Sequence, residues 1–230
     1  MTETRTDRRG VIGAGALVAG VAGAGVLASA PARAEDAGGW KAAQEPQDAW
    51  MDIPGTRHRM VYDSNSPQGF AEALFYASNY YFANKAGYGL SPDTLGVILI
   101  ARHMGTPFAY TDAIWAKYGA AFAKVAGLEG KEAELAKTVN PLLVPGRVAM
   151  SGPAGDASVA TLAKTGARFA VCGLATTFIA GMLAKETGGS AKDIDAELSA
   201  GLVPGATMVA AGILAVERAQ SHGYAFAYVG

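Results

Sequence analysis

The only cysteine of the chain, Cys172, is the side chain best suited to nucleophilic chemistry. It follows a short apolar run, 167–171, that predicts a buried strand, and it precedes a run from Leu174 to Lys185 with apolar residues at helical spacing. A helix N-terminus favours a thiolate and lowers the pKa of a thiol from its usual value of about 8.5. Cys172 is therefore a candidate reactive sulfur. The alternative is an inert core cysteine, because free cysteines are among the most buried residues.

Two cationic side chains follow another predicted strand. Residues 95–100, LGVILI, are almost all aliphatic, which predicts a strand buried on both faces of a parallel sheet. Arg102 and His103 come just after it. Since the carboxyl ends of parallel strands meet at one edge of the sheet, both side chains are expected near Cys172, where either cation could hold a thiolate. The alternative is a solvated Arg102 and a hydrogen-bonded loop His103.

Asn65, which follows the first predicted strand, and Gly173, which follows Cys172, are further candidate supporting residues. No metal site and no cofactor are predicted, because the three histidines lie far apart in the sequence without a carboxylate or a second cysteine at ligand spacing. The glycines form no phosphate-binding loop, and no Gly-x-Ser-x-Gly elbow of a hydrolase is present. The two functions that remain for this chain are thiol chemistry at its cysteine and non-catalytic binding.

Short apolar runs alternate with helical segments along the body of the chain, which predicts a three-layer α/β/α domain with a parallel sheet of about five strands. Ser66 and Pro67 are typical of the N-cap and first position of a helix, which is expected to end at Gly87. Residues 128–153 are broken by glycine and proline and are predicted to form a lid or an oligomer contact. The expected strands are 57–63, 95–100, 167–171, 206–210 and 224–229, and the later helices are 112–127, 158–164, 174–185, 191–200 and 212–221.

The first 34 residues have the features of an export signal. Arg8 and Arg9 precede a weakly apolar run, 11–30, and Ala34 ends an Ala-x-Ala cleavage site. The paired arginines resemble those of a twin-arginine signal, which predicts export of a folded protein to the periplasm. An uncleaved leader that anchors the protein in a membrane is the alternative. Residues 35–56 are expected to be a linker, so that the domain spans 57–230.

Composition limits the partners of this 230-residue chain, half of which is hydrophobic. Without the leader, 15 basic and 18 acidic side chains remain, and a mildly acidic body gives no reason to expect nucleic acid or an anionic membrane surface. One cysteine forbids an internal disulfide, so the fold depends on its hydrophobic core. The aromatic cluster Tyr76, Tyr80, Tyr81 and Phe82 predicts either core or a surface for homo-oligomer formation.

Two stretches carry a resemblance to a known family. Residues 169–175, FAVCGLA, and 212–224, GILAVERAQSHGY, together with 202–204, LVP, are similar to the cysteine strand and to the last helix and strand of the DsrE/DsrF-like sulfur-relay family. The resemblance covers roughly residues 57–229. The export leader and the long segment 128–153 are departures from the short cytoplasmic members.

The resemblance implies a small α/β domain, usually oligomeric, whose cysteine accepts a sulfur atom as a persulfide and hands it on. That role maps onto Cys172 alone, and the implied partners are sulfur donor and acceptor proteins. The second hypothesis is an exported module of the same fold that binds a small ligand without catalysis.

Overall fold

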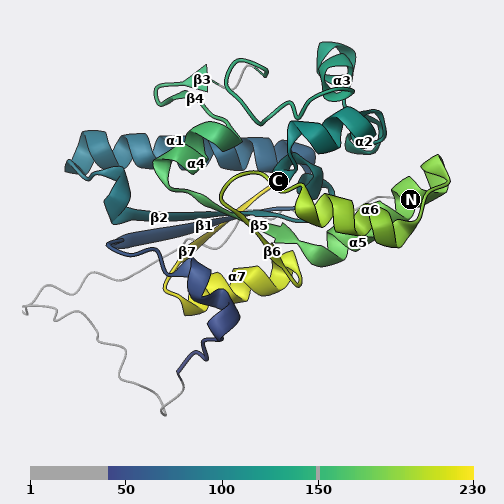
Figure 1. Ribbon diagram of the computed structural model, residues 1–230. Helices are drawn as coiled ribbons and strands as arrows, with labels where there is room; N and C mark the ends of the chain where they lie inside the picture. Colours follow the sequence, from purple (N-terminus) through teal and green to yellow (C-terminus); the bar gives the residue numbers. More distant parts are fainter. Residues whose placement is uncertain (1–40, 149–150) are drawn as a thin grey trace, which may run out of the picture. The chain divides into compact units, whose positions relative to one another are not determined.

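Five parallel strands form the central sheet of the computed structural model, which describes residues 41–148 and 151–230 (Figure 1). The strands are β1 (His58–Ser64), β2 (Leu95–Ala101), β5 (Arg168–Cys172), β6 (Ala206–Val209) and β7 (Ala225–Val229), in the order β6-β5-β2-β1-β7. A separate antiparallel pair joins β3 (Ser151–Gly152) to β4 (Gly155–Asp156). The predicted parallel sheet of five strands is confirmed.

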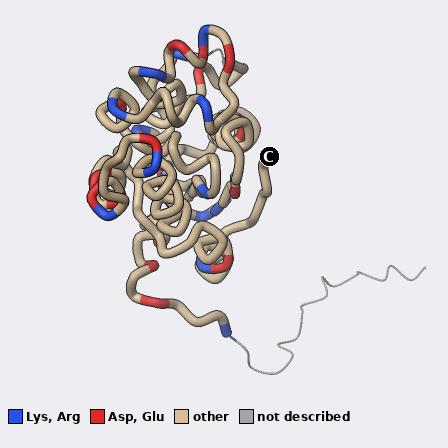
Figure 2. Tube along the Cα trace, turned by 90° about the vertical axis from the view of Figure 1, so that its right-hand side faces the viewer, with Lys and Arg blue, Asp and Glu red and all other residues tan. Residues whose placement is uncertain are grey.

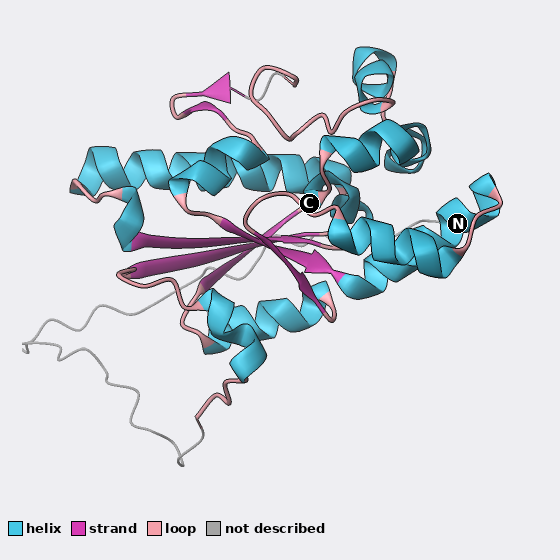
Figure 3. Cartoon of the chain, in the orientation of Figure 1, coloured by secondary structure: helices cyan, strands magenta, loops and turns pink. Residues whose placement is uncertain are grey.

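Seven α-helices and three short 3-10 helices connect these strands in the described part of the chain (Figure 3). The α-helices are α1 (Pro67–Tyr88), α2 (Asp112–Ala126), α3 (Gly130–Ala136), α4 (Val159–Thr165), α5 (Gly173–Thr187), α6 (Ala191–Ala200) and α7 (Gly212–Ser221). The 3-10 helices are η1 (Pro46–Met51), η2 (Pro92–Thr94) and η3 (His103–Ala109). None of the helices within residues 41–148 and 151–230 has the length and apolar character that a membrane span requires.

The apolar run of β2 is buried on both sides, as its composition predicts. Side chains alternate between the two faces of a strand, so Val97 and Leu99 enter one hydrophobic cluster while Ile98 and Ile100 enter another. Both clusters are closed by helices, which confirms the three-layer α/β/α architecture. Cys172 lies two residues after Ala170 on β5, which belongs to the second cluster, and it therefore faces the same side of the sheet.

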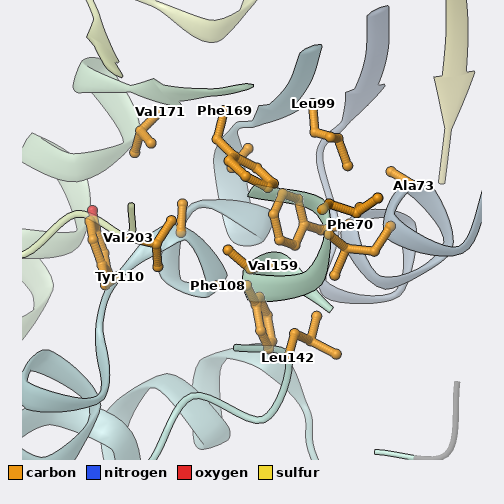
Figure 4. Close-up of a cluster of buried hydrophobic side chains, with 14 of the residues drawn as sticks. Phe70, Ala73, Leu99, Phe108, Tyr110, Leu142, Val159, Phe169, Val171 and Val203 are labelled. Atoms are coloured by element: carbon orange, nitrogen blue, oxygen red, sulfur yellow. The ribbon is translucent and has the colours of Figure 1, made fainter. Parts of the chain in front are cut away.

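The two helical layers are unequal. The first face of the sheet is covered by α1, α2, α4, α5 and α6, and its aromatic and aliphatic side chains form the larger cluster (Figure 4). The second face is covered by α7 and by η1 (Figure 1). Met51 of η1 is fully buried there, and its carbonyl oxygen accepts a hydrogen bond from Tyr224 Oη at 2.5 Å. The end of the expected linker is therefore packed against the domain.

Helix α1 begins as its sequence predicts. Ser66 is the N-cap, its hydroxyl accepts a hydrogen bond from the Gly69 backbone N–H at 2.9 Å, and Pro67 occupies the first position. The predicted end at Gly87 is wrong, because the helix continues to Tyr88 and Gly89 takes the left-handed conformation, with a φ of 66°. This later end places Leu90 against the larger hydrophobic cluster.

Residues 1–40, which include the predicted leader, lie outside the described residues, as do residues 149 and 150 of the long insertion. The described part of the insertion contains α3. Lysines and arginines are interspersed with acidic residues over most of the described chain, and the segment before β1 carries the acidic residues Glu45, Asp48 and Asp52 (Figure 2).

Candidate functional site

The candidate site lies at the carboxyl edge of the sheet, where β5 passes directly into α5. Cys172 is both the last residue of the strand and the N-cap of the helix, and its Sγ accepts a hydrogen bond from the Ala175 backbone N–H at 3.4 Å. The residue is only 7% exposed. The sulfur therefore accepts a hydrogen bond from one of the free N–H groups of the helix and lies at the positive end of the helix dipole.

Arg102 reaches the same edge from β2, but its guanidinium is committed to a carboxylate. Its Nε and Nη2 donate hydrogen bonds to Asp63 Oδ1 and Oδ2, at 2.7 and 2.9 Å. The hydrogen bonds to Asp63 raise the pKa of Arg102, and the negative charge of Asp63 and of a Cys172 thiolate act in the same direction. Arg102 is therefore not the solvated residue that was one of the two expectations. Its hydrogen bonds go to Asp63 and not to the Cys172 sulfur, but its positive charge still lies beside the cysteine.

Asp63 belongs to the candidate site, and the sequence analysis did not single it out. It lies near the end of β1, faces the same side of the sheet as Val61, and its side chain is 3% exposed. A signal was available in the sequence, because a buried carboxylate at the end of an apolar strand requires a cationic partner, and Arg102 directly follows the neighbouring strand.

Two glycines allow the elements around Cys172 to approach closely. A Cβ at Gly173 would lie 2.9 Å from the carbonyl oxygen of Val209, and a Cβ at Gly212 would lie 2.5 Å from Arg102 Cβ. Gly173, a predicted supporting residue, therefore lets the first turn of α5 pack against the end of β6. Gly212 does the same for the first turn of α7 against Arg102.

These elements border an open cavity of about 280 Å³. It is lined by Arg102, His103, Cys172, Leu174, Ala175, Phe178, Ala211, Gly212 and Ile213. Three large apolar side chains of this lining, Leu174, Phe178 and Ile213, are 69%, 56% and 63% exposed, and we call these three the apolar rim. The cavity therefore brings together a thiol, a guanidinium and an imidazole, and it has an apolar rim.

The other two predicted supporting residues take different positions. His103 lines the cavity with Cys172, so the structure brings these two residues together as expected. Asn65 is absent from this lining. Its backbone carbonyl accepts a hydrogen bond from the Met104 N–H at 3.2 Å, so Asn65 supports the loop that carries His103.

A buried polar pair lies behind the cysteine. Thr176 Oγ1 donates a hydrogen bond to the Cys172 carbonyl oxygen at 3.0 Å, and Tyr110 Oη lies 2.8 Å from the same hydroxyl. With the threonine proton used in this way, Tyr110 is the donor to Thr176. Burial raises the pKa of Tyr110, so its phenol keeps this proton. The pair fixes the first turn of α5 on which Cys172 depends.

No group of three or more metal-ligating side chains is found among residues 41–148 and 151–230. Comparison of the chain with protein-family models, with curated proteins and with solved structures finds no match.

Proposed function

We propose that this protein is an exported sulfur carrier of the DsrE/DsrF-like kind, which accepts a sulfur atom on Cys172 as a persulfide and passes it to an acceptor protein. The observation that carries the proposal is the position of Cys172 Sγ. It is the N-cap of α5 and lines a cavity that it shares with Arg102 and His103.

The physical argument concerns the anion that a sulfur carrier must hold. A thiolate and a persulfide anion are both stabilised by the free N–H groups and the dipole of a helix N-terminus, and by a nearby cation. Ala175 supplies the N–H and Arg102 supplies a permanent positive charge, which Asp63 keeps in place. The cavity of about 280 Å³ has room for an additional sulfur atom on Cys172.

A non-catalytic module that binds a small ligand is the second candidate. The apolar rim of Leu174, Phe178 and Ile213 favours it, because apolar walls with a few polar groups are typical of ligand sites. In that function Cys172 would be a wall of the site and its chemistry would be unused. The two candidates differ in whether the thiol reacts.

The deciding experiment measures sulfur uptake by the folded protein. After incubation with inorganic polysulfide, we expect the peptide that contains Cys172 to gain the mass of one sulfur atom. The matched Cys172→Ser variant should show no gain and should keep its free energy of unfolding within about 1 kcal/mol, because serine is also a good N-cap.

Accessibility of the thiol is the control. Iodoacetamide should alkylate Cys172 in the folded protein, since this residue lines the cavity. An alkylated thiol that gains no sulfur from polysulfide would leave the binding module as the better function.

Two further proposals concern location and assembly. The leader should be removed before Glu35 during twin-arginine export to the periplasm, and the intact mass of the exported protein tests this. A homo-oligomer should form through α1, where Tyr76 and Phe82 are 45% and 46% exposed. Sedimentation that shows a monomer at high micromolar concentration would contradict the second proposal.

A further inference from the structure

The backbone of His103 is unusual. Among the described residues it is the one non-glycine residue with a positive φ, 51°, which places it in the left-handed region. L-amino acids with a Cβ avoid this region, and residues that are held in it occur preferentially at functional sites. Glycine would adopt this backbone conformation at a lower steric cost, so a functional role of the histidine side chain would explain its presence here.

Backbone contacts on both sides hold His103 in this conformation. The N–H of Arg102 donates to the Ser64 carbonyl at 3.1 Å, and the N–H of Met104 donates to the Asn65 carbonyl at 3.2 Å. The following residue, Gly105, packs so closely that a Cβ there would lie 3.2 Å from the Ser66 carbonyl oxygen. The loop therefore turns sharply over the end of β1 and presents His103 to the cavity of Cys172.

Apart from Cys172 and His103, the side chains that line the cavity cannot exchange a proton near neutral pH. Arg102 keeps its charge and donates two hydrogen bonds to Asp63. The remaining lining apart from Cys172 consists of apolar residues and glycine. Imidazole is the side chain that gains and loses a proton in this range.

We propose that His103 is the proton-transfer residue for the reaction at Cys172, a role that rests on the proposed sulfur-carrier function. With an alkyl persulfide R–S–SH as donor, the imidazole accepts the thiol proton of Cys172. The thiolate attacks the terminal sulfur, a new S–S bond forms, and the old S–S bond breaks with its electron pair on R–S⁻. The imidazolium then protonates R–S⁻, so that Cys172–SH and R–S–SH become Cys172–S–SH and R–SH without any net oxidation.

Two variants test this role with glutathione persulfide as the donor. His103→Gly should melt at a higher temperature than the wild type, because glycine takes a φ of 51° without a steric cost, yet accept sulfur about 100-fold more slowly. Added imidazole should restore part of the rate. His103→Asn is the matched control, because asparagine tolerates the left-handed region but cannot exchange the proton, and it should be as slow without rescue.

Rates within threefold of the wild type in both variants would overturn the role of His103. If the wild type takes up no sulfur at all, the sulfur-carrier function fails instead. The variants are then compared by the rate at which iodoacetamide alkylates Cys172 at neutral pH, a reaction that also releases the thiol proton. Slower alkylation with imidazole rescue supports proton transfer by His103, and equal alkylation rates overturn it.

Discussion

At the scale of single residues, the buried pair of Asp63 and Arg102 defines the charge beside Cys172. The Asp63 side chain is 3% exposed and the Arg102 side chain 22%, and two short hydrogen bonds join them. Such a bidentate pair fixes the plane of the guanidinium as well as its position. Asp63 thus holds the positive charge of Arg102 at the cavity, although Asp63 itself does not line that cavity.

Replacing Asp63 with asparagine should lower the free energy of unfolding by about 3 kcal/mol, because Arg102 would lose the partner of a largely buried charge. Urea unfolding measures this loss. Glu186→Gln is the control, since Glu186 is exposed on α5, and it should change stability by less than about 0.5 kcal/mol. A loss below about 1 kcal/mol for Asp63→Asn would mean that water replaces the carboxylate easily.

At the scale of elements, the insertion 128–153 is fastened to the domain. Arg147 donates hydrogen bonds to both carboxylate oxygens of Asp112 at the start of α2, at 2.6 and 2.8 Å. The buried side chain of Asn140 donates to the carbonyls of Phe108 and Tyr110, at 2.8 and 2.7 Å. The prediction that this segment forms a lid or an oligomer contact stays a prediction, and its described part from Asn140 to Arg147 is anchored.

The ion pair of Arg147 with Asp112 should make the stability of the fold depend on pH. Hydrogen bonds from Arg147 hold the pKa of Asp112 below its usual value, so the folded state binds this proton less readily than the unfolded state. The stabilisation is therefore present above about pH 4 and is lost as the pH falls below it. Asp112→Asn should cost about 1 kcal/mol at pH 7.

The measurement is urea unfolding of the wild type and of Asp112→Asn at a series of pH values. The difference between them should shrink as the pH falls from about 4 to about 2, because Asp112 becomes protonated, and as neutral as the asparagine, only as the pH passes through its lowered pKa. Arg147→Ala should show the same pH dependence, because it removes the other half of the pair. A difference that stays constant down to about pH 2 would show that the charge of Asp112 contributes nothing.

At the scale of the domain formed by residues 42–230, the second face of the sheet has the thinner cover. There α7 packs on the sheet together with η1, whose Met51 is fully buried in the smaller cluster. Salt bridges tie the same segment to the end of α7 and to its surroundings, since Asp48 lies 3.4 Å from Arg218 and Asp52 lies 3.1 Å from Arg59. The segment before β1 is therefore part of the core.

Shortening Met51 to alanine should lower the free energy of unfolding by about 2 to 4 kcal/mol, because it removes a fully buried side chain and leaves a cavity. Gln47→Ala in the same 3-10 helix is the control, since Gln47 is exposed and should change little. Chemical denaturation of both variants measures the difference. If the free energy of unfolding of Met51→Ala equals that of the wild type, this segment contributes nothing to the core and is only a linker.

The sequence by itself determined the fold class and the place of the cysteine. Aliphatic runs such as LGVILI have no amphipathic face to turn toward water, so they must lie between two layers, and their alternation with helical segments leaves a parallel sheet. Strong local signals, such as Ser66 with Pro67, also located helix starts, because a cap depends on neighbouring residues alone.

The tertiary structure decided what surrounds the cysteine. The pairing of Arg102 with Asp63 depends on β1 and β2 being neighbours in the sheet, and the close approach of Gly212 to Arg102 depends on how α7 crosses it. The left-handed backbone of His103 is imposed by hydrogen bonds to residues about 40 positions earlier in the chain. Such contacts join segments that are distant in sequence, and no local pattern of residue types records them.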